Sequence, residues 1–200
     1  MKAATDLNIL AFGPNWLGDA VMCTPALRAL RSRFPEARLT IAAREGICDL
    51  LEGLPWIDGF ETLPKRPGFA AMLQCGRRLR RERYDLCAVF PHSIRAALLA
   101  RMTGAKQRIG YRRDRRSWLL TDVVEPHRVE GRIAPVYMAQ EYLAMLAPLG
   151  CAEDGQGLEL HANPKEIDVV RARLRAAGGV VGRPVAGFAP GAAFGPSKQW

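Results

Sequence analysis

A glycine-bounded loop that ends in a carboxylate is the first stretch of this sequence that could do chemistry. Residues 13–20 read GPNWLGDA, between an apolar run and a helix-like segment. The spacing of Gly13 and Gly18 matches the start of a phosphate-binding loop, but Asp19 stands where such a loop has lysine. Asp19 either caps the following helix or serves as a general base that takes a proton from a substrate hydroxyl. In the second case the glycines would let the backbone approach that substrate closely.

A second glycine-rich turn lies at the other end of the chain, where residues 189–200 read APGAAFGPSKQW. It is either an ordinary loop or a phosphate-binding turn with Lys198 as the counter-charge. In the latter case the phosphate chemistry belongs to a second domain, and Asp19 faces it across a cleft.

Polar residues also cluster where a predicted strand meets a helix. Ser93 either caps that helix or, together with Arg95, forms an anion-binding edge at the helix N-terminus. The run RRDRR at 112–116 follows another strand and is either a charged loop or a site for phosphate and carboxylate, which arginine binds well.

The run RRLRRER at 77–83 is either a solvated helix face or an anion-binding surface. Arg77, Arg81 and Arg78 share one helical face, and Arg80 and Arg83 lie on another, so not all of them can serve one site.

Composition narrows the class of protein. A net charge of +9 over 200 residues favours an anionic partner, such as nucleic acid, an anionic membrane surface or an anionic sugar. The 5 cysteines are scattered without a C-x-x-C pair, which argues against disulfides and against a zinc site, so no metal or cofactor is expected.

No apolar run is long enough for a membrane span, and the protein is expected to be soluble and at most peripheral. No nucleic-acid-binding motif appears, so nucleic acid is not expected, although a basic nucleic-acid-binding module stays an alternative.

The order of apolar runs predicts an α/β fold, with a Rossmann-like parallel sheet that carries helices on both faces. Ligands of such sheets bind outside the carboxyl ends of the strands, where residues 13–19, 91–93 and 111–116 are expected to lie. The predicted strands are 8–13, 37–43, 59–64, 85–91 and 107–111, and the predicted helices are 20–33, 45–51, 69–83, 93–104, 135–149 and 164–177.

The last part of the sequence reads as the beginning of a second domain. Residues 178–184 are punctuated by glycine and proline like a linker, and residues 185–192 restart the strand-and-loop pattern. A strand and a loop cannot close a core of their own. We therefore expect a first domain over 1–180 and an incomplete second domain over 181–200, with the chain truncated soon after that domain begins.

Several of these stretches together resemble a known family. ILAFGPNWLGDAVMCTPALRALRSRFPEARL at 9–39 and FAPGAAFGPSKQW at 188–200 are similar to the opening segments of the two domains of lipopolysaccharide inner-core heptosyltransferases, which belong to glycosyltransferase family 9. YDLCAVFPHSIRAAL and RIGYRRDRRSWLLTDVV look like the intervening segments of the second inner-core heptosyltransferase, type II. The resemblance covers nearly the whole chain.

The resemblance implies a GT-B architecture, in which an N-terminal domain binds the acceptor and a C-terminal domain binds ADP-heptose. It implies an inverting transfer of heptose to a Kdo/heptose-lipid A acceptor, at the cytoplasmic face of the inner membrane and in peripheral contact with its anionic surface. Another nucleotide-sugar donor stays an alternative. Since most of the donor site would lie beyond residue 200, this chain alone is expected to turn over little or nothing.

By the same resemblance Asp19 matches the general base, and Lys198, assisted by Ser197, matches the residue that contacts the donor diphosphate. The residues that the resemblance places on the acceptor side are Asn15, Trp16, Gly18, Ser93, Arg95, Arg112 and Arg116.

Overall fold

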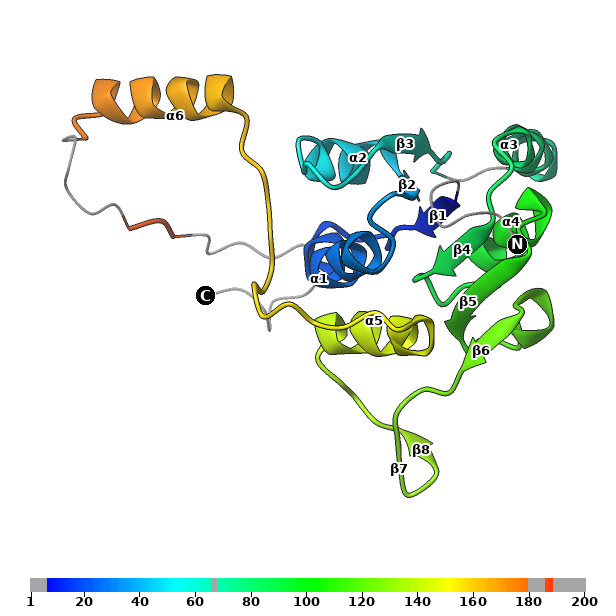
Figure 1. Ribbon diagram of the computed structural model, residues 1–200. Helices are drawn as coiled ribbons and strands as arrows, with labels where there is room; N and C mark the ends of the chain where they lie inside the picture. Colours follow the sequence, from blue (N-terminus) through cyan, green and yellow to red (C-terminus); the bar gives the residue numbers. More distant parts are fainter. Residues whose placement is uncertain (1–6, 66–67, 180–185, 189–200) are drawn as a thin grey trace. The chain divides into compact units, whose positions relative to one another are not determined.

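The computed structural model describes residues 7–65, 68–179 and 186–188 (Figure 1). The chain divides into two compact units, residues 1–161 and residues 162–200. The expected domain boundary after residue 180 stays a prediction.

The first unit is built on a 6-stranded parallel sheet. The strands lie side by side in the order β3-β2-β1-β4-β5-β6. This order reverses between β1 and β4, and in open sheets of this type ligands bind at that switch point, outside the carboxyl ends of the strands. The strands are β1 (Asn8–Phe12), β2 (Arg38–Ala43), β3 (Gly59–Thr62), β4 (Leu86–Val89), β5 (Gln107–Tyr111) and β6 (Asp122–Val124).

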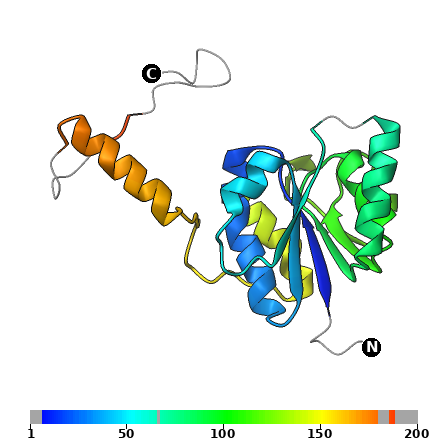
Figure 2. The same cartoon turned by 90° about the horizontal axis from the view of Figure 1, so that it is seen from above.

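Helices cover both faces of the sheet, as Figure 2 shows. One face carries α1 (Leu17–Arg33), α2 (Glu45–Leu51) and α5 (Met138–Leu146), and the other carries α3 (Phe69–Arg81) and α4 (Ile94–Thr103). In β1, Ile9 and Ala11 belong to the core on the first face, and Leu10 and Phe12 belong to the core on the second. Because both faces are buried, the strand reads as one apolar run. The predicted Rossmann-like α/β fold is confirmed.

Helix α1 begins at Leu17, before the predicted start at residue 20, and continues through Pro25. A proline inside a helix leaves the carbonyl four residues earlier without its amide donor. Here that carbonyl belongs to Val21, and the hydroxyl of Thr24 donates a hydrogen bond to it at 2.7 Å. The neighbouring side chain thus replaces the missing bond, which lets the helix continue across the proline.

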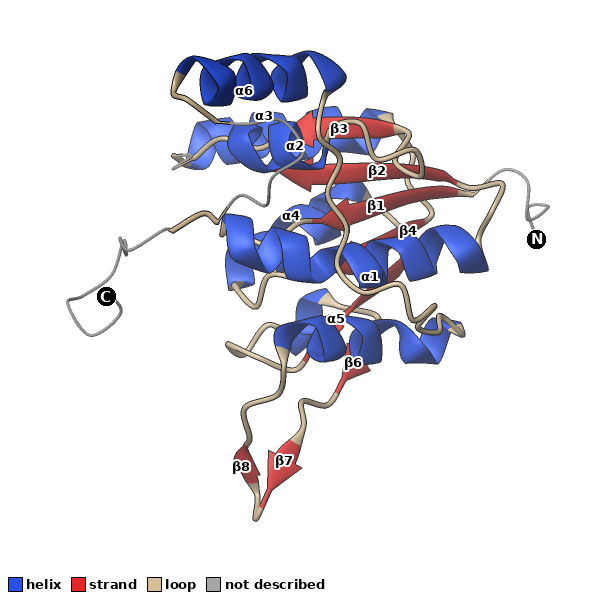
Figure 3. Cartoon of the chain, turned by 90° about the vertical axis from the view of Figure 1, so that its left-hand side faces the viewer, coloured by secondary structure: helices blue, strands red, loops and turns tan. Residues whose placement is uncertain are grey.

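The segment after β5 holds structure that the sequence pattern did not predict. A short 3-10 helix (Ser117–Leu119) leads into β6, which extends the sheet beyond β5. An antiparallel hairpin comes next, formed by β7 (Arg128–Val129) and β8 (Arg132–Ile133), and Figure 3 shows it projecting from the sheet. These strands are 2 or 3 residues long, too short to give a recognisable apolar period.

Residues 151–161, here called the strap, run along the outer side of α1. The guanidinium of Arg28 donates to both carboxylate oxygens of Asp154 and, at 2.8 Å, to Glu159 Oε2. Glu159 also accepts from Trp56 Nε1 at 3.1 Å, and its amide donates to the Thr24 hydroxyl at 3.0 Å. Arg28 is only 7% exposed, so the strap encloses an ion pair that ties it to α1.

The second unit contains α6 (Pro164–Ala176). Asn163 caps this helix by accepting a hydrogen bond from the Lys165 amide at 3.0 Å. Within the described residues, no helix is both long enough and apolar enough to cross a membrane.

Candidate functional site

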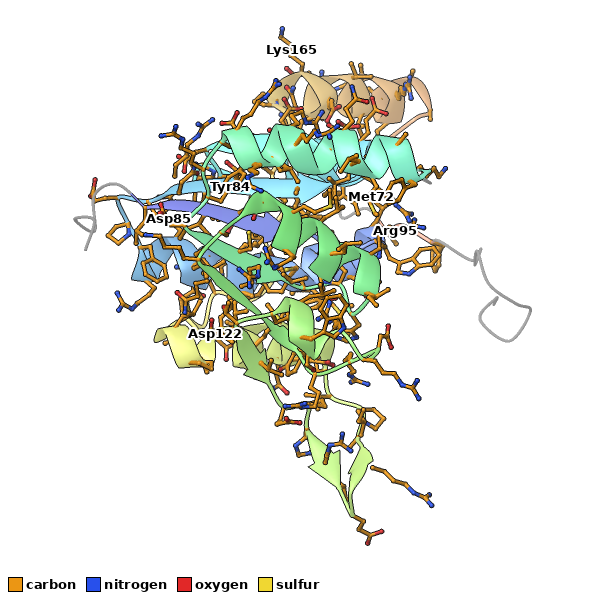
Figure 4. All side chains as sticks on the ribbon, turned by 90° about the vertical axis from the view of Figure 1, so that its right-hand side faces the viewer. Met72, Tyr84, Asp85, Arg95, Asp122 and Lys165 are labelled. Atoms are coloured by element: carbon orange, nitrogen blue, oxygen red, sulfur yellow. The ribbon has the colours of Figure 1, made fainter. Side chains whose placement is uncertain are left out.

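The carboxyl edge of the sheet holds a pocket at the switch point between β1 and β4, here called the switch-point pocket. Its cavity volume is about 80 Å³. Figure 4 labels two residues of its wall, Met72 and Arg95, at the end of the sheet opposite Asp85, which precedes β4. The lining residues come from the loops after β1, β2, β3 and β4 and from α3 and α4, and include Gly13, Asn15, Arg44, Lys65, Ser93 and Arg95. The pocket therefore lies where the topology predicts a ligand.

Three of the predicted acceptor-side residues meet in this pocket: Asn15, Ser93 and Arg95. Ser93 also caps α4, since its hydroxyl accepts from the Ala96 amide at 3.3 Å. The capping interpretation of Ser93 is confirmed, and its role at an anion-binding edge stays a prediction that its place in the pocket wall supports. Arg95 and Asn15 are exposed.

Asp19 lies in the first turn of α1 rather than at its cap position, which Trp16 occupies. Its side chain is half-buried, and within the described residues it makes no hydrogen bond or ion pair. Gly18 beside it faces open space, since a Cβ placed there would meet no atom within 4 Å. A helix N-terminus favours a nearby negative charge, but Asp19 is not among the residues that line the switch-point pocket, so its role as a base stays a prediction.

The structure corrects the expectation for Arg116. Its side chain is 0% exposed, and its guanidinium donates to main-chain carbonyls, among them those of Tyr111 at 3.2 Å and Pro91. A Cβ added to Gly110 would lie 3.2 Å from Arg116 Nη2, so the glycine makes room for it. Burial lowers the pKa of Arg116 to about 10. Arg116 therefore holds the β4 and β5 loops in place and cannot reach an acceptor directly.

Arg112 is exposed and forms an ion pair with Glu125 instead of lining the switch-point pocket. Ser197 and Lys198 lie outside the described residues, and their donor-side roles stay predictions.

A polar cluster adjoins this edge on the face that carries α1 and α5. Glu141 of α5 lies 3.3 Å from His92 Nε2 and accepts from Arg113 Nη2 at 3.5 Å, while its carbonyl accepts from the Tyr111 hydroxyl at 2.6 Å. Burial lowers the pKa of His92, Arg113 and Arg116 lower it further, and Glu141 opposes them. Burial therefore favours the neutral form of the imidazole.

Arg44 and Lys65 add positive charge to the switch-point pocket, and neither was predicted from the sequence. A signal was available, because both residues come after predicted strands, and the carboxyl ends of parallel strands meet at one edge. The same rule correctly placed Asn15 and Ser93 at this edge, but a single basic residue without a neighbouring motif has the same pattern as a solvated surface charge.

Comparison with known proteins places the chain in a family. The profile of glycosyltransferase family 9 (heptosyltransferase) matches residues 72–200, more than half of the chain. The chain belongs to glycosyltransferase family 9. Within this family it is 31% identical to lipopolysaccharide heptosyltransferase 2 of Escherichia coli (strain K12), over 97% of this chain and 57% of that protein.

Solved structures of family 9 proteins have the same fold. The structure of E. coli ADP-heptose lps heptosyltransferase II matches with a TM-score of 0.74 and 28% identity, over 97% of this chain and 57% of that one. A family 9 glycosyltransferase from Veillonella parvula DSM 2008 matches with a TM-score of 0.84 and 20% identity, over 99% of this chain and 57% of that one. The chain thus spans 57% of the length of these family 9 proteins.

Proposed function

We propose that this chain is the acceptor-binding part of an inverting heptosyltransferase, which transfers heptose from ADP-heptose to the inner core of lipopolysaccharide. The observation that carries the proposal is the Asp19 carboxylate at the carboxyl edge of the sheet, half-buried and without a partner among the described residues. The family supports the reaction class, and the names of the E. coli relatives support the donor and the acceptor.

In the proposed mechanism the acceptor sugar lies at the switch point, held by Asn15, Ser93 and Arg95. Asp19 accepts the proton of the attacking hydroxyl while the hydroxyl oxygen forms a bond to the anomeric carbon of the donor. The bond from that carbon to the diphosphate oxygen breaks at the same time, and ADP leaves with the electron pair. A single displacement inverts the anomeric centre, and Lys198 and Ser197 would stabilise the leaving diphosphate.

The acceptor is proposed to be heptose-bearing Kdo-lipid A, which is anionic and membrane-bound. The positive groups of the switch-point pocket, Arg44, Lys65 and Arg95, suit its carboxylates and phosphates. The net charge of +9 would also favour contact with an anionic membrane surface, so we propose a cytoplasmic protein in peripheral contact with the inner membrane.

An Asp19→Asn variant tests the mechanism in a protein that joins this chain to a donor-binding domain. We expect turnover, measured by mass spectrometry of the product, to fall by about 10²- to 10⁴-fold, because the base is lost. Acceptor affinity should change little, because the amide has the same shape. Asp49→Asn, an exposed carboxylate on α2, is the control and should leave turnover unchanged. Near-normal turnover of Asp19→Asn would remove Asp19 as the base.

A further inference from the structure

A second hollow lies directly beside the switch-point pocket, between the end of β3 and the second half of α3. We call it the α3 groove. Its volume is about 680 Å³, and it is lined by Thr62, Pro64, Ala71, Gln74, Cys75, Arg77, Arg78 and Arg81. Pro64 and Cys75 also line the switch-point pocket, so the two hollows adjoin.

The α3 groove is positively charged, and part of that charge is not neutralised by the protein. Arg78 donates to the Thr62 carbonyl at 2.9 Å and pairs with Glu61 at 3.0 Å. Arg77 and Arg81 are exposed, and within the described residues the side chain of neither makes a hydrogen bond or an ion pair. None of the described residues that line the groove carries a carboxylate.

The position of Arg77 and Arg81 on the helix supports a ligand site. Side chains four residues apart lie over the same helix face, and like charges at this spacing repel each other. An anion bound between two guanidinium groups is attracted by both, which offsets their mutual repulsion. Phosphate oxygens match the several N–H donors that lie in the plane of each guanidinium group. Arg80 lies on the same helix and Arg83 lies just after its end, and neither residue lines the groove.

We propose that the α3 groove binds phosphate groups of the acceptor while its reacting sugar occupies the adjoining switch-point pocket. This inference rests on the proposed function and extends it, since it assigns a second anion subsite to the acceptor. Continuity with the pocket and complementary charge favour the acceptor itself over a separate ligand.

The experiment is a thermodynamic cycle on the 200-residue chain. Isothermal titration measures its affinity for heptosylated Kdo-lipid A in detergent, with the lipid A phosphates present or removed enzymatically. The double variant Arg77→Gln/Arg81→Gln is compared with the control Arg80→Gln/Arg83→Gln, which removes the same charge outside the groove. Thermal unfolding verifies that both variants fold.

We expect the double variant to lose about 10- to 100-fold in affinity for the phosphorylated acceptor, as for lost hydrogen bonds to a charged group. Its affinity for the dephosphorylated acceptor should change little. The effects of the double substitution and of removing the phosphates are then not additive. The control variant should bind like the unmutated chain.

The outcomes separate this inference from the proposed function. The inference fails, and the proposed function stands, if the unmutated chain binds the acceptor but the double variant binds it as the control does. The same holds if the effects of the double substitution and of dephosphorylation are additive. If the chain binds no acceptor, both proposals fail. If Arg77 and Arg81 govern binding to anionic lipid vesicles that lack the acceptor, and not to the acceptor, the groove contacts the membrane and the inference is wrong.

Discussion

At the scale of single residues, the same side-chain type has different roles at the carboxyl edge of the sheet. Arg95 lines the switch-point pocket and is exposed, whereas Arg116 is fully buried and holds main-chain carbonyls. A buried guanidinium is tolerated only where hydrogen bonds compensate its lost hydration, and the carbonyls of Tyr111 and Pro91 provide that compensation. Arg116 thereby positions the loop that carries Ser93 without touching a ligand.

His92 should make stability depend on pH. Because burial lowers its pKa below the ordinary 6.5, the unfolded chain binds a proton before the folded chain does. The free energy of unfolding should therefore fall as the pH decreases from about 6.5 through the folded pKa. His92→Gln should reduce this acid-induced loss, measured by urea unfolding at pH 7.5 and pH 5, and the exposed control His127→Gln should not. An unchanged pH dependence in His92→Gln would contradict the prediction.

At the scale of elements, hydrogen bonds and an ion pair hold the strap against α1. Arg28, on the outer side of α1, bonds Asp154, Glu159 and the Gly157 carbonyl, and so holds a segment with no regular structure. The Arg28 guanidinium lowers the pKa of Asp154 to about 2, because its hydrogen bond favours the charged carboxylate.

An Arg28→Met variant should release the strap. Removing one partner of a partly buried ion pair leaves carboxylates without compensation, and we expect the free energy of unfolding to fall by about 2 kcal/mol. Amide hydrogen exchange over residues 154–159 should become faster than in the unmutated chain. Arg171→Met is the control, since Arg171 pairs with Asp168 at 3.7 Å on the exposed surface of α6. Unchanged exchange in the strap would show that Arg28 does not hold it.

At the scale of the whole molecule, the buried core belongs to the first unit. Every described side chain that is buried lies before residue 152, and Cys151 is the last of them. The α6 helix buries none of its residues. Since burial of apolar surface is the main source of stability, the first unit should be thermodynamically independent of residues 162–200.

Residues 1–161 alone should therefore fold and unfold at nearly the temperature of the 200-residue chain. We expect the midpoint of thermal unfolding, monitored by circular dichroism at 222 nm, to shift by no more than about 4 °C, which corresponds to less than about 2 kcal/mol for a unit of this size. A larger decrease would show that residues 162–200 stabilise the first unit.

The sequence alone determined the first five strands of the sheet, most of its helices and the edge at which the candidate site lies. Apolar runs and the 3.6-residue period act over short distances, so strands such as β1 and helices such as α4 could be placed from their own residues. The short strands β6, β7 and β8 were missed because they carry no such period.

Only the tertiary structure decided which charged side chains are available. Arg28 meets Asp154 across 126 residues, and Arg116 meets Pro91 across 25. Such partners depend on how the elements pack, because burial and hydrogen bonding are set by neighbours in space. The same side-chain type is therefore a buried support at Arg116, an ion-pair partner at Arg28 and, among the described residues, an exposed and unpaired group at Arg77.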